Sequence, residues 1–313
     1  MEIIDEILST SYFKDNPPVL IDVGASGTIH NKWKDISLYS ICICFDADER
    51  EFKIDEIENS GYKRLIKINR ALTEYENSLI DFYLTDSPYC SSTLEPQNTK
   101  LKPWLFSNYF NVIEIQKIGS TTINNVLKSL EIKYVDWLKL DTQGTDLRLF
   151  TSLPQEIKEG IIAAEFEPGI IDAYKGEDKL YSVLKVMHES GYWLSSMDTK
   201  GTQRIENKYI DIFGLENINR TIPASPGWAE MTYLKEFDIT NIRSLLLLYV
   251  LALLQKQYGF ALEVCYNLKK IDDSPIVDRA IEFVFKIIKD SDLKHYSLKS
   301  RVKNYLLRKL NSL

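Results

Sequence analysis

The stretch LIDVGASGTIHNKW, residues 20–33, ends an apolar run at Asp22 and continues into two glycines, Gly24 and Gly27, with only small residues between them. Glycines let backbone N–H groups approach a ligand closely where a strand leads into the following segment. In an open parallel sheet, ligands bind at the carboxyl ends of the strands. This stretch therefore predicts a strand of an α/β fold that carries a ligand-binding turn at its carboxyl end.

The composition of the 313-residue chain narrows the class of protein. Hydrophobic residues make up 44% of the chain, which supports a buried core, and the formal net charge is −7. This excess of acidic residues argues against a nucleic-acid partner, because surfaces that bind nucleic acid need clustered lysine and arginine. The four cysteines lack metal-binding or redox spacing, and we expect buried thiols in a reducing compartment.

Two features bear on localisation. The acidic first residues lack the basic segment of a signal peptide. The longest apolar run, LLLLYVLALL at 245–254, is shorter than the about 20 residues that a membrane span needs. We expect a soluble cytoplasmic protein.

Short apolar runs separated by longer amphipathic segments predict the sheet. Runs such as YSICICF at 39–45 and GIIAAEF at 160–166 are apolar at successive positions, as is typical of strands buried on both faces. We expect a mainly parallel sheet with helices on both faces, with strands at 19–23, 40–45, 65–68, 79–84, 112–116, 137–140 and 161–166. Prolines and a glycine in TIPASPGWAEM at 221–231 interrupt this pattern, and only helical periodicity follows. We therefore expect one domain over residues 1–228 and a helical module over 229–313.

A second polar group follows the second expected strand, in FDADE at 45–49. Asp46 stands 22 residues after Gly24, the spacing at which an acidic residue accepts hydrogen bonds from both hydroxyls of a ribose. NAD is the first alternative, but the turn reads GASGTI and lacks the third glycine of G-x-G-x-x-G. S-adenosylmethionine has a ribose and no phosphate, and it fits the single short turn better.

Five stretches follow one another in a specific order: LIDVGASG with Trp33, CFDADE, SSTLEPQ, VDWLKLDTQGTDLRLF and AAEFEPGIIDAYKGEDKLYSVLKVMHESGY. In this order they resemble the FkbM-type S-adenosylmethionine-dependent methyltransferases over residues 19–197, and LKLDTQGTDL is the most specific element. The resemblance implies a class I (Rossmann-like) methyltransferase fold with a seven-stranded sheet, and S-adenosyl-L-methionine as cofactor. It also implies O-methylation of a hydroxyl on a sugar, glycan or related natural product.

The resemblance also implies site residues. It puts the turn after the first strand at the methionine end and Asp46 on the ribose, which gives as cofactor residues Asp22, Gly24, Ala25, Ser26, Gly27, Asp46, Ala47, Ala71 and Asp141. It puts the SSTLEP loop near the acceptor, for which we expect Ser91, Ser92, Glu95 and Tyr174. The family usually has Glu-Pro where Asp46 and Ala47 stand, and aspartate is one methylene shorter, so we expect a shifted or water-mediated ribose contact.

Methyl transfer to a hydroxyl needs a group that takes its proton. Asp141 is the first candidate, because it follows an apolar strand directly, and Glu165, Glu167 and His30 are further candidates. Aspartate also caps helices, so Asp141 has a structural alternative as the cap of a helix near Thr145. Glu165 interrupts an apolar strand, and it needs either a cation such as Arg148 or a place facing the pocket.

Further alternatives stay open at this point. The SSTLEP loop is also a capped turn, and the rings expected to stack on a sugar, Trp33, Trp104 and Tyr174, are also typical core residues. No metal-ligand cluster is evident, and we expect a metal-independent reaction. Two alternatives to the O-methyltransferase remain: a catalytically silent protein that binds S-adenosylmethionine or a nucleoside, and a nicotinamide-dependent oxidoreductase. The basic amphipathic segment at 292–313 either packs on the helical module or contacts an anionic membrane from its inner face.

Overall fold

The computed structural model describes residues 2–25, 29, 31–48, 50, 61–76, 79–236 and 241–290. Three expected site residues, Ser26, Gly27 and His30, lie outside the described residues, as does the basic segment 292–313. The chain divides into two compact units, one formed by Ser11–Glu236 and the other by Met1–Thr10 with Phe237–Leu313.

The domain boundary that we expected after residue 228 is wrong. It falls inside strand β10 (Ala224–Lys235), which belongs to the larger unit. The proline and glycine that pointed to a linker lie at a register shift between Pro226 and Trp228, where β10 bulges against its neighbour. Proline and glycine are tolerated at such irregular positions of a strand.

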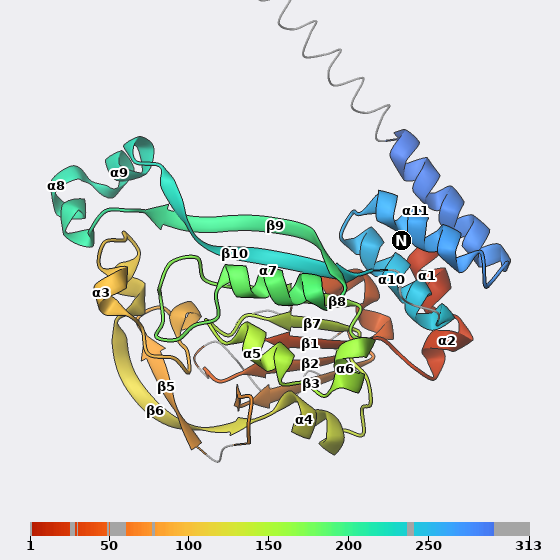
Figure 1. Ribbon diagram of the computed structural model, residues 1–313, viewed down its shortest axis with the longest axis horizontal. Coiled ribbons are helices and arrows are strands. Elements are labelled where there is room, and N and C mark those ends of the chain that lie inside the picture. Colours follow the sequence, from red (N-terminus) through yellow and green to blue (C-terminus); the bar gives the residue numbers. More distant parts are fainter. Residues whose placement is uncertain are drawn as a thin grey trace, which may run out of the picture. The chain divides into compact units, whose positions relative to one another are not determined.

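A seven-stranded sheet forms the centre of the larger unit (Figure 1). Its order is β3-β2-β1-β7-β8-β10-β9. These strands are β1 (Val19–Val23), β2 (Ile41–Asp46), β3 (Arg64–Asn69), β7 (Trp137–Leu140), β8 (Ala163–Phe166), β9 (Tyr192–Gln203) and β10. Neighbouring strands from β3 to β8 run parallel, and β10 runs antiparallel to both β8 and β9. The expected mainly parallel α/β sheet is confirmed.

Helices cover both faces of this sheet, because its central strands are apolar at successive positions. Every residue of β1 is buried. On one face, η1 (Asn31–Tyr39) sets the ring of Trp33 edge-on to Trp137, 5.7 Å between centroids. On the other, α5 (Asp146–Thr151) sets Phe150 against Phe166 at 5.6 Å. The remaining helices along this part of the chain are α2 (Ser11–Lys14), α4 (Ile123–Ser129), α6 (Gln155–Gly160) and α7 (Leu180–Glu189).

Two of the expected sheet strands, 79–84 and 112–116, do not join the main sheet. They form β5 (Leu79–Thr85) and β6 (Val112–Thr121), an antiparallel pair that makes a separate three-stranded sheet with β4 (Ala71–Leu72). Half of the residues of β6 are exposed, whereas the central parallel strands β1, β2, β7 and β8 are almost entirely buried. The main sheet instead takes β9 and β10, which the sequence did not reveal because β9 is largely polar.

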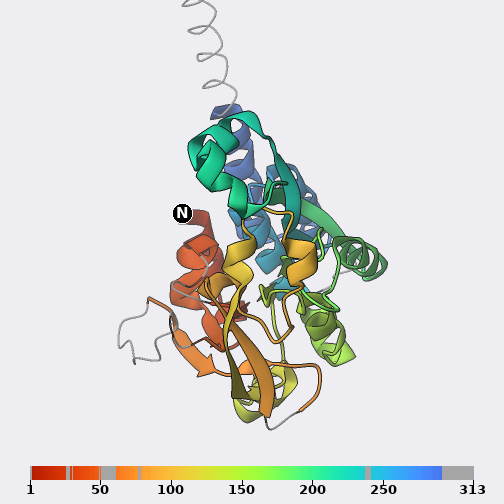
Figure 2. The ribbon, with the colours of Figure 1, turned by 90° about the vertical axis from the view of Figure 1, so that its left-hand side faces the viewer.

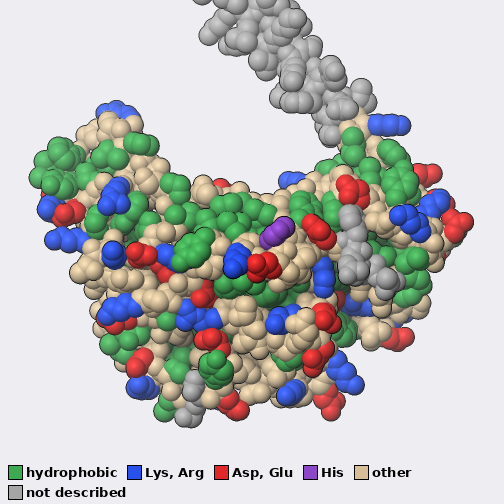
Figure 3. Space-filling view, in the orientation of Figure 1, with side chains coloured by type: hydrophobic (Ala, Val, Ile, Leu, Met, Phe, Trp, Pro, Cys, Tyr) green, Lys and Arg blue, Asp and Glu red, His purple; other side chains and the backbone are tan. Residues whose placement is uncertain are grey.

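Short helices connect these strands at one end of the unit. Between β5 and β6 lie η2 (Pro88–Cys90), α3 (Asn98–Leu101) and η3 (Ser107–Phe110), and between β9 and β10 lie η4 (Asn207–Tyr209), α8 (Ile210–Phe213) and α9 (Leu215–Thr221). Figure 2 looks onto this end, where α3 lies between the β5–β6 pair and the tip formed by α8 and α9. Hydrophobic side chains gather on that tip (Figure 3), where Ile212, Phe213 and Leu215 are exposed.

The described part of the smaller unit is helical. It contains α1 (Glu2–Leu8), α10 (Ile242–Leu254), α11 (Tyr258–Leu268) and a helix over 275–290. The apolar run in α10 is buried within this unit, and the hydroxyl of Tyr249 donates to the carbonyl of Ala280 at 2.9 Å. Among the described residues, no helix has both the length and the apolar character that a membrane crossing requires.

Candidate functional site

A cavity of about 510 Å³ opens at the carboxyl ends of β1, β2, β7 and β8. Gly24, Asp46, Asp141 and Glu167 line it at or just beyond the ends of these four strands. The rest of the described wall comes from η2, η3, the loop around Tyr174, and the paired strands β9 and β10. This volume lies in the range of small-molecule sites, about 300–1,000 Å³.

The turn after β1 is fixed by its two neighbouring strands. The backbone N–H groups of Gly24 and Ala25 donate to the carbonyl of Phe45 at 2.9 and 3.1 Å. On the other side, the N–H of Asp141 donates to the carbonyl of Val23 at 3.1 Å. Gly24 has φ +76°, a left-handed conformation that glycine adopts without strain. Gly24 lines the cavity, and Ala25 is buried outside its described lining.

Asp46 lies at the end of β2 with its carboxyl group on the cavity. Its Oδ1 accepts the N–H of Asp48 at 2.8 Å. Burial raises the pKa of Asp46 to about 6, against the effect of that hydrogen bond. Asp48 also lines the cavity, but both of its carboxylate oxygens accept from Nε of Arg50, at 2.9 and 3.0 Å. Asp46 therefore has the greater free acceptor capacity. Ala47 and Ala71, both expected cofactor residues, line the cavity beside it.

Asp22 does not line the cavity, contrary to its expected place at the methionine end. It is 1% exposed, and its Oδ1 accepts from Nζ of Lys139 at 3.0 Å. The two residues are register partners on the neighbouring strands β1 and β7, so their side chains lie on the same face of the sheet. Nζ of Lys139 also lies 4.0 Å from Oδ2 of Asp141. Burial opposes the charge of Lys139, but the two carboxylates outweigh it and raise the pKa of Lys139 above its ordinary value. Asp22 thus holds a charged lysine beside Asp141.

Gln143, which the sequence analysis missed, orients Asp141. Its Nε2 donates to Oδ1 of Asp141 at 2.8 Å. Its φ is +57°, uncommon for a residue other than glycine, and the hydroxyl of Ser92 donates to its carbonyl at 2.8 Å. The hydroxyl of Tyr174 lies 3.1 Å from Oε1 of Gln143 and 2.8 Å from the carbonyl of Cys90. Such strained residues cluster at functional sites.

The alternative that Asp141 caps the following helix is wrong. The loop before α5 is held by Asp146, whose carboxylate accepts the N–H groups of Thr142 and Glu167, both at 2.8 Å. The side chain of Thr145, the residue before α5, makes no capping hydrogen bond either. Asp141 is therefore left to face the cavity.

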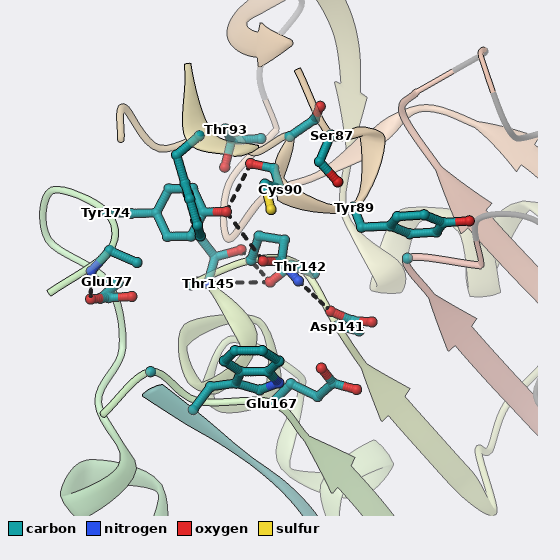
Figure 4. A pocket seen from close by; sticks show the side chains of 18 of the residues that line it. Ser87, Tyr89, Cys90, Thr93, Asp141, Thr142, Thr145, Glu167, Tyr174 and Glu177 are labelled. Atoms are coloured by element: carbon teal, nitrogen blue, oxygen red, sulfur yellow. Dashed lines mark hydrogen bonds between the residues drawn. The ribbon is translucent and has the colours of Figure 1, made fainter. Parts of the chain in front are cut away.

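Asp141 and Glu167 form an interacting pair of carboxyl groups. They follow the neighbouring strands β7 and β8, and Figure 4 shows both groups on the same side of the cavity. Burial raises the pKa of Asp141 to about 6, with Lys139 opposing the shift. Burial and then the charge of Asp141 raise the pKa of Glu167 to about 9. Near neutral pH the pair therefore offers one base and one proton donor.

Glu165, an expected candidate for the base, lies elsewhere. It does not line the cavity, and Nζ of Lys32 lies 3.0 Å from its Oε2. Lys32 belongs to η1, on the face opposite α5, which carries the expected partner Arg148. Arg148 instead pairs with Asp178 at 2.9 Å. Glu165 is therefore a buried member of an ion pair, and Glu167 is the carboxyl group of this segment that reaches the cavity.

The expected acceptor residues divide into two groups. Ser91 and Tyr174 line the cavity, although the hydroxyl of Ser91 already accepts from Arg50 at 2.8 Å. Ser92 and Glu95 lie outside the described lining. Ser92 braces Gln143, and Glu95 pairs with Lys175 at the surface, 2.6 Å between charged atoms.

Four rings in contact form an aromatic wall of the cavity. The ring centroids of Trp228 and Phe106 are 6.2 Å apart, those of Phe106 and Phe110 are 5.2 Å apart, and those of Phe110 and Tyr174 are 5.6 Å apart. We refer to these four residues as the aromatic wall. Sequence analysis missed three of them, because the rings come from separate segments of the chain. Of the other rings expected to stack on a sugar, Trp33 is a core residue and Trp104 is buried outside the described lining.

Two remaining findings concern metals and relatives. Within the described ranges, no group of three or more histidine, cysteine, aspartate or glutamate side chains is arranged to hold a metal ion.

No protein-family model matches the chain, and no curated protein sequence matches it.

Proposed function

We propose that this protein is an S-adenosylmethionine-dependent O-methyltransferase that acts on a hydroxyl of a sugar, glycan or related natural product. The observation that carries the proposal is that the turn at Gly24, the carboxyl group of Asp46 and the carboxyl group of Asp141 share one cavity at the carboxyl ends of parallel strands. In the proposed enzyme, the turn binds the methionine end of the cofactor, Asp46 binds its ribose, and Asp141 takes the proton of the acceptor.

The sheet topology supports the class I methyltransferase fold. Numbered along the chain, the seven strands of the main sheet have the order 3-2-1-4-5-7-6, and the seventh is antiparallel. This is the arrangement of class I methyltransferases. The dinucleotide-binding fold has the order 3-2-1-4-5-6 without the inserted antiparallel strand, which disfavours the oxidoreductase alternative.

The cavity fits the cofactor in chemistry as well as size. In the proposed pose, Asp46 accepts the two ribose hydroxyls, because an ionised carboxylate has acceptors to spare. Ala71, Leu72 and Phe82 supply apolar surface on the cavity for the adenine ring. Gly24 lies at the methionine end. When bound, the cofactor supplies an electrophilic methyl group on a sulfonium.

Side chains of the cavity bind the acceptor and take its proton. Asp141, ionised near neutral pH and held by Gln143, receives the proton of the acceptor hydroxyl. Glu167, the second carboxyl group of the pair, faces a second polar group of the acceptor. The aromatic wall packs on the apolar face of a sugar ring. Holding the acceptor oxygen in line with the methyl group contributes about 7–11 kcal/mol to lowering the barrier.

Two measurements test this proposal. Calorimetry compares S-adenosylhomocysteine with NAD, and we expect only the former to bind. Labelled methyl transfer from S-adenosylmethionine is then followed on sugar nucleotides, free oligosaccharides and lipid-linked glycans in parallel, and we expect label in at least one of them. Binding of NAD alone would support the oxidoreductase, and S-adenosylhomocysteine binding without any transfer would support the silent binding protein.

A further inference from the structure

The carboxyl group of Glu167 stands out among the acids of the cavity. Within the part of the chain that the structure describes, its side chain makes no hydrogen bond or ion pair, and only its backbone N–H is engaged, with Asp146. A half-buried carboxyl group without a partner is unfavourable, which makes it a group that a ligand satisfies.

The other lining acids already have partners. Asp46 accepts from the backbone of Asp48, Asp48 from Arg50, Asp141 from Gln143 and Glu177 from Lys179, and Glu230 lies 3.6 Å from Nζ of Lys200. Among the described lining residues, the one lysine or arginine is Arg70. It follows Asn69, whose amide donates to the carbonyl of Asp46, so it lies on the nucleoside side. The acceptor side is therefore rich in carboxyl groups and lined with rings.

We propose that the acceptor carries a protonated amine, as in an amino sugar, which binds between Glu167 and the aromatic wall while a neighbouring hydroxyl faces Asp141. The proposal rests on the proposed function and names its class of substrate. An ammonium group is attracted both to a carboxylate and to the faces of aromatic rings. A neutral sugar leaves Glu167 without a charged partner. A sugar phosphate meets no lysine or arginine on the acceptor side of the described lining, because Arg70 lies on the other side.

The protonation of the pair gives the proposal a second readout. In the free protein, burial and the charge of Asp141 raise the pKa of Glu167 to about 9, so Glu167 carries a proton at pH 7. A bound ammonium favours the ionised form of Glu167, and the proton is released to the buffer. A neutral sugar releases no proton.

The experiment uses the full chain saturated with S-adenosylhomocysteine. Matched pairs of methyl hexosides and methyl aminohexosides, which differ only by an amine in place of one hydroxyl, are titrated by calorimetry in two buffers of different ionisation enthalpy. We expect at least one amine to bind tenfold or more tightly than its hydroxyl partner, with a heat that depends on the buffer. We expect its N-acetyl derivative to lose the advantage, because acetylation removes the charge.

Two variants assign the preference to Glu167. We expect Glu167→Gln to lose the preference for the amine while binding S-adenosylhomocysteine as before, which also shows that it folds. Glu156→Gln, an exposed change on α6 outside the described lining, is the matched control and keeps the preference. Equal affinities in every pair, no binding of any amine, or a preference that survives in Glu167→Gln overturns the proposal. Failure of S-adenosylhomocysteine to bind counts against the proposed function itself, whereas its binding without a preference for amines counts against this inference alone.

Discussion

Gly24 and Asp141 approach so closely that a Cβ atom on residue 24 would lie 2.0 Å from the carbonyl oxygen of Asp141. The contacted atom belongs to the backbone of a neighbouring strand end, and it cannot rotate away. The turn proposed to hold the cofactor and the residue proposed to take the proton are therefore fixed relative to each other by direct backbone contact.

Gly24→Ala tests this contact. We expect it to lower the free energy of unfolding by more than the about 1–3 kcal/mol that left-handed strain alone costs, and to weaken S-adenosylhomocysteine binding at least tenfold. Gly191→Ala is the matched control, because Gly191 has the same φ of +76° and nothing within 4 Å of its Cβ position. Denaturant unfolding and calorimetry measure both effects. Equal losses of stability in the two variants would contradict the proposed role of the contact.

Asp46→Asn separates binding from stability. The folded protein raises the pKa of Asp46 from 3.8 to about 6, so it favours the protonated form. The stability contributed by that form is present at low pH and lost as the pH rises through about 6. At pH 7 the free energy of unfolding of the asparagine variant should therefore exceed that of the wild-type protein by up to about 3 kcal/mol. Its affinity for S-adenosylhomocysteine should fall at least tenfold, because asparagine has fewer acceptors for the ribose.

The same pKa predicts a pH dependence for the wild-type protein. S-adenosylhomocysteine affinity should fall as the pH drops below about 6, where Asp46 becomes protonated. Asp198→Asn, a change at an exposed residue paired with Lys200, is the control and keeps the wild-type profile. If the wild-type affinity for S-adenosylhomocysteine does not change between pH 5 and 7, the ribose contact lies elsewhere.

Asp141→Asn should lower turnover by about a hundredfold or more, because asparagine keeps the size of the side chain but cannot take a proton. In the wild-type enzyme, turnover should fall as the pH drops below about 6, since Asp141 must be ionised to act as a base. Glu165→Gln is the comparison: it breaks the pair with Lys32 outside the described lining, and it should lower stability while turnover stays within a few-fold. If Asp141→Asn remains active with an unaltered pH profile, Glu167 becomes the candidate base.

Gln143→Gly tests the positioning of Asp141. The amide of Gln143 stabilises the ionised carboxylate, so its removal should raise the pKa of Asp141 and move the acidic limb of the pH–rate profile to higher pH. The loss of turnover should be larger at pH 6 than at pH 8. Glu131→Gly is a matched control, because Glu131 is exposed and has the same φ of +57°. It relieves equal backbone strain, and it should leave the profile unmoved.

The basic segment at 292–313 gives a prediction from sequence alone. Six lysines and arginines stand in it against the single acid Asp292. If it contacts membranes, the full chain should sediment with anionic vesicles at low salt and not at high salt. Deletion of 292–313 should abolish sedimentation while S-adenosylhomocysteine binding is retained. No sedimentation of the full chain at low salt would leave packing on the helical module as its role.

The strands that line the site were predictable because their signal is local. β1, β2, β7 and β8 are short, mostly apolar runs, and a glycine or an acidic residue at or just beyond the end of each run marks the carboxyl end of a parallel strand. The outer pair β9 and β10 was not predictable in this way. The residues of β9 are largely polar and partly exposed, and a bulge at Pro226 makes β10 resemble a linker.

The sequence by itself determined that Gly24, Asp46 and Asp141 stand at strand ends that share one edge of a sheet. Only the tertiary structure decided which other side chains face the cavity. Glu165 lies within β8 and points to η1, where Lys32 meets it, whereas Glu167 lies beyond the end of the strand and reaches the cavity. The partners of a side chain are set by the elements that pack on its face of the sheet, and those elements come from distant parts of the chain. The same reason explains the aromatic wall, whose four rings meet only after three separate segments fold together.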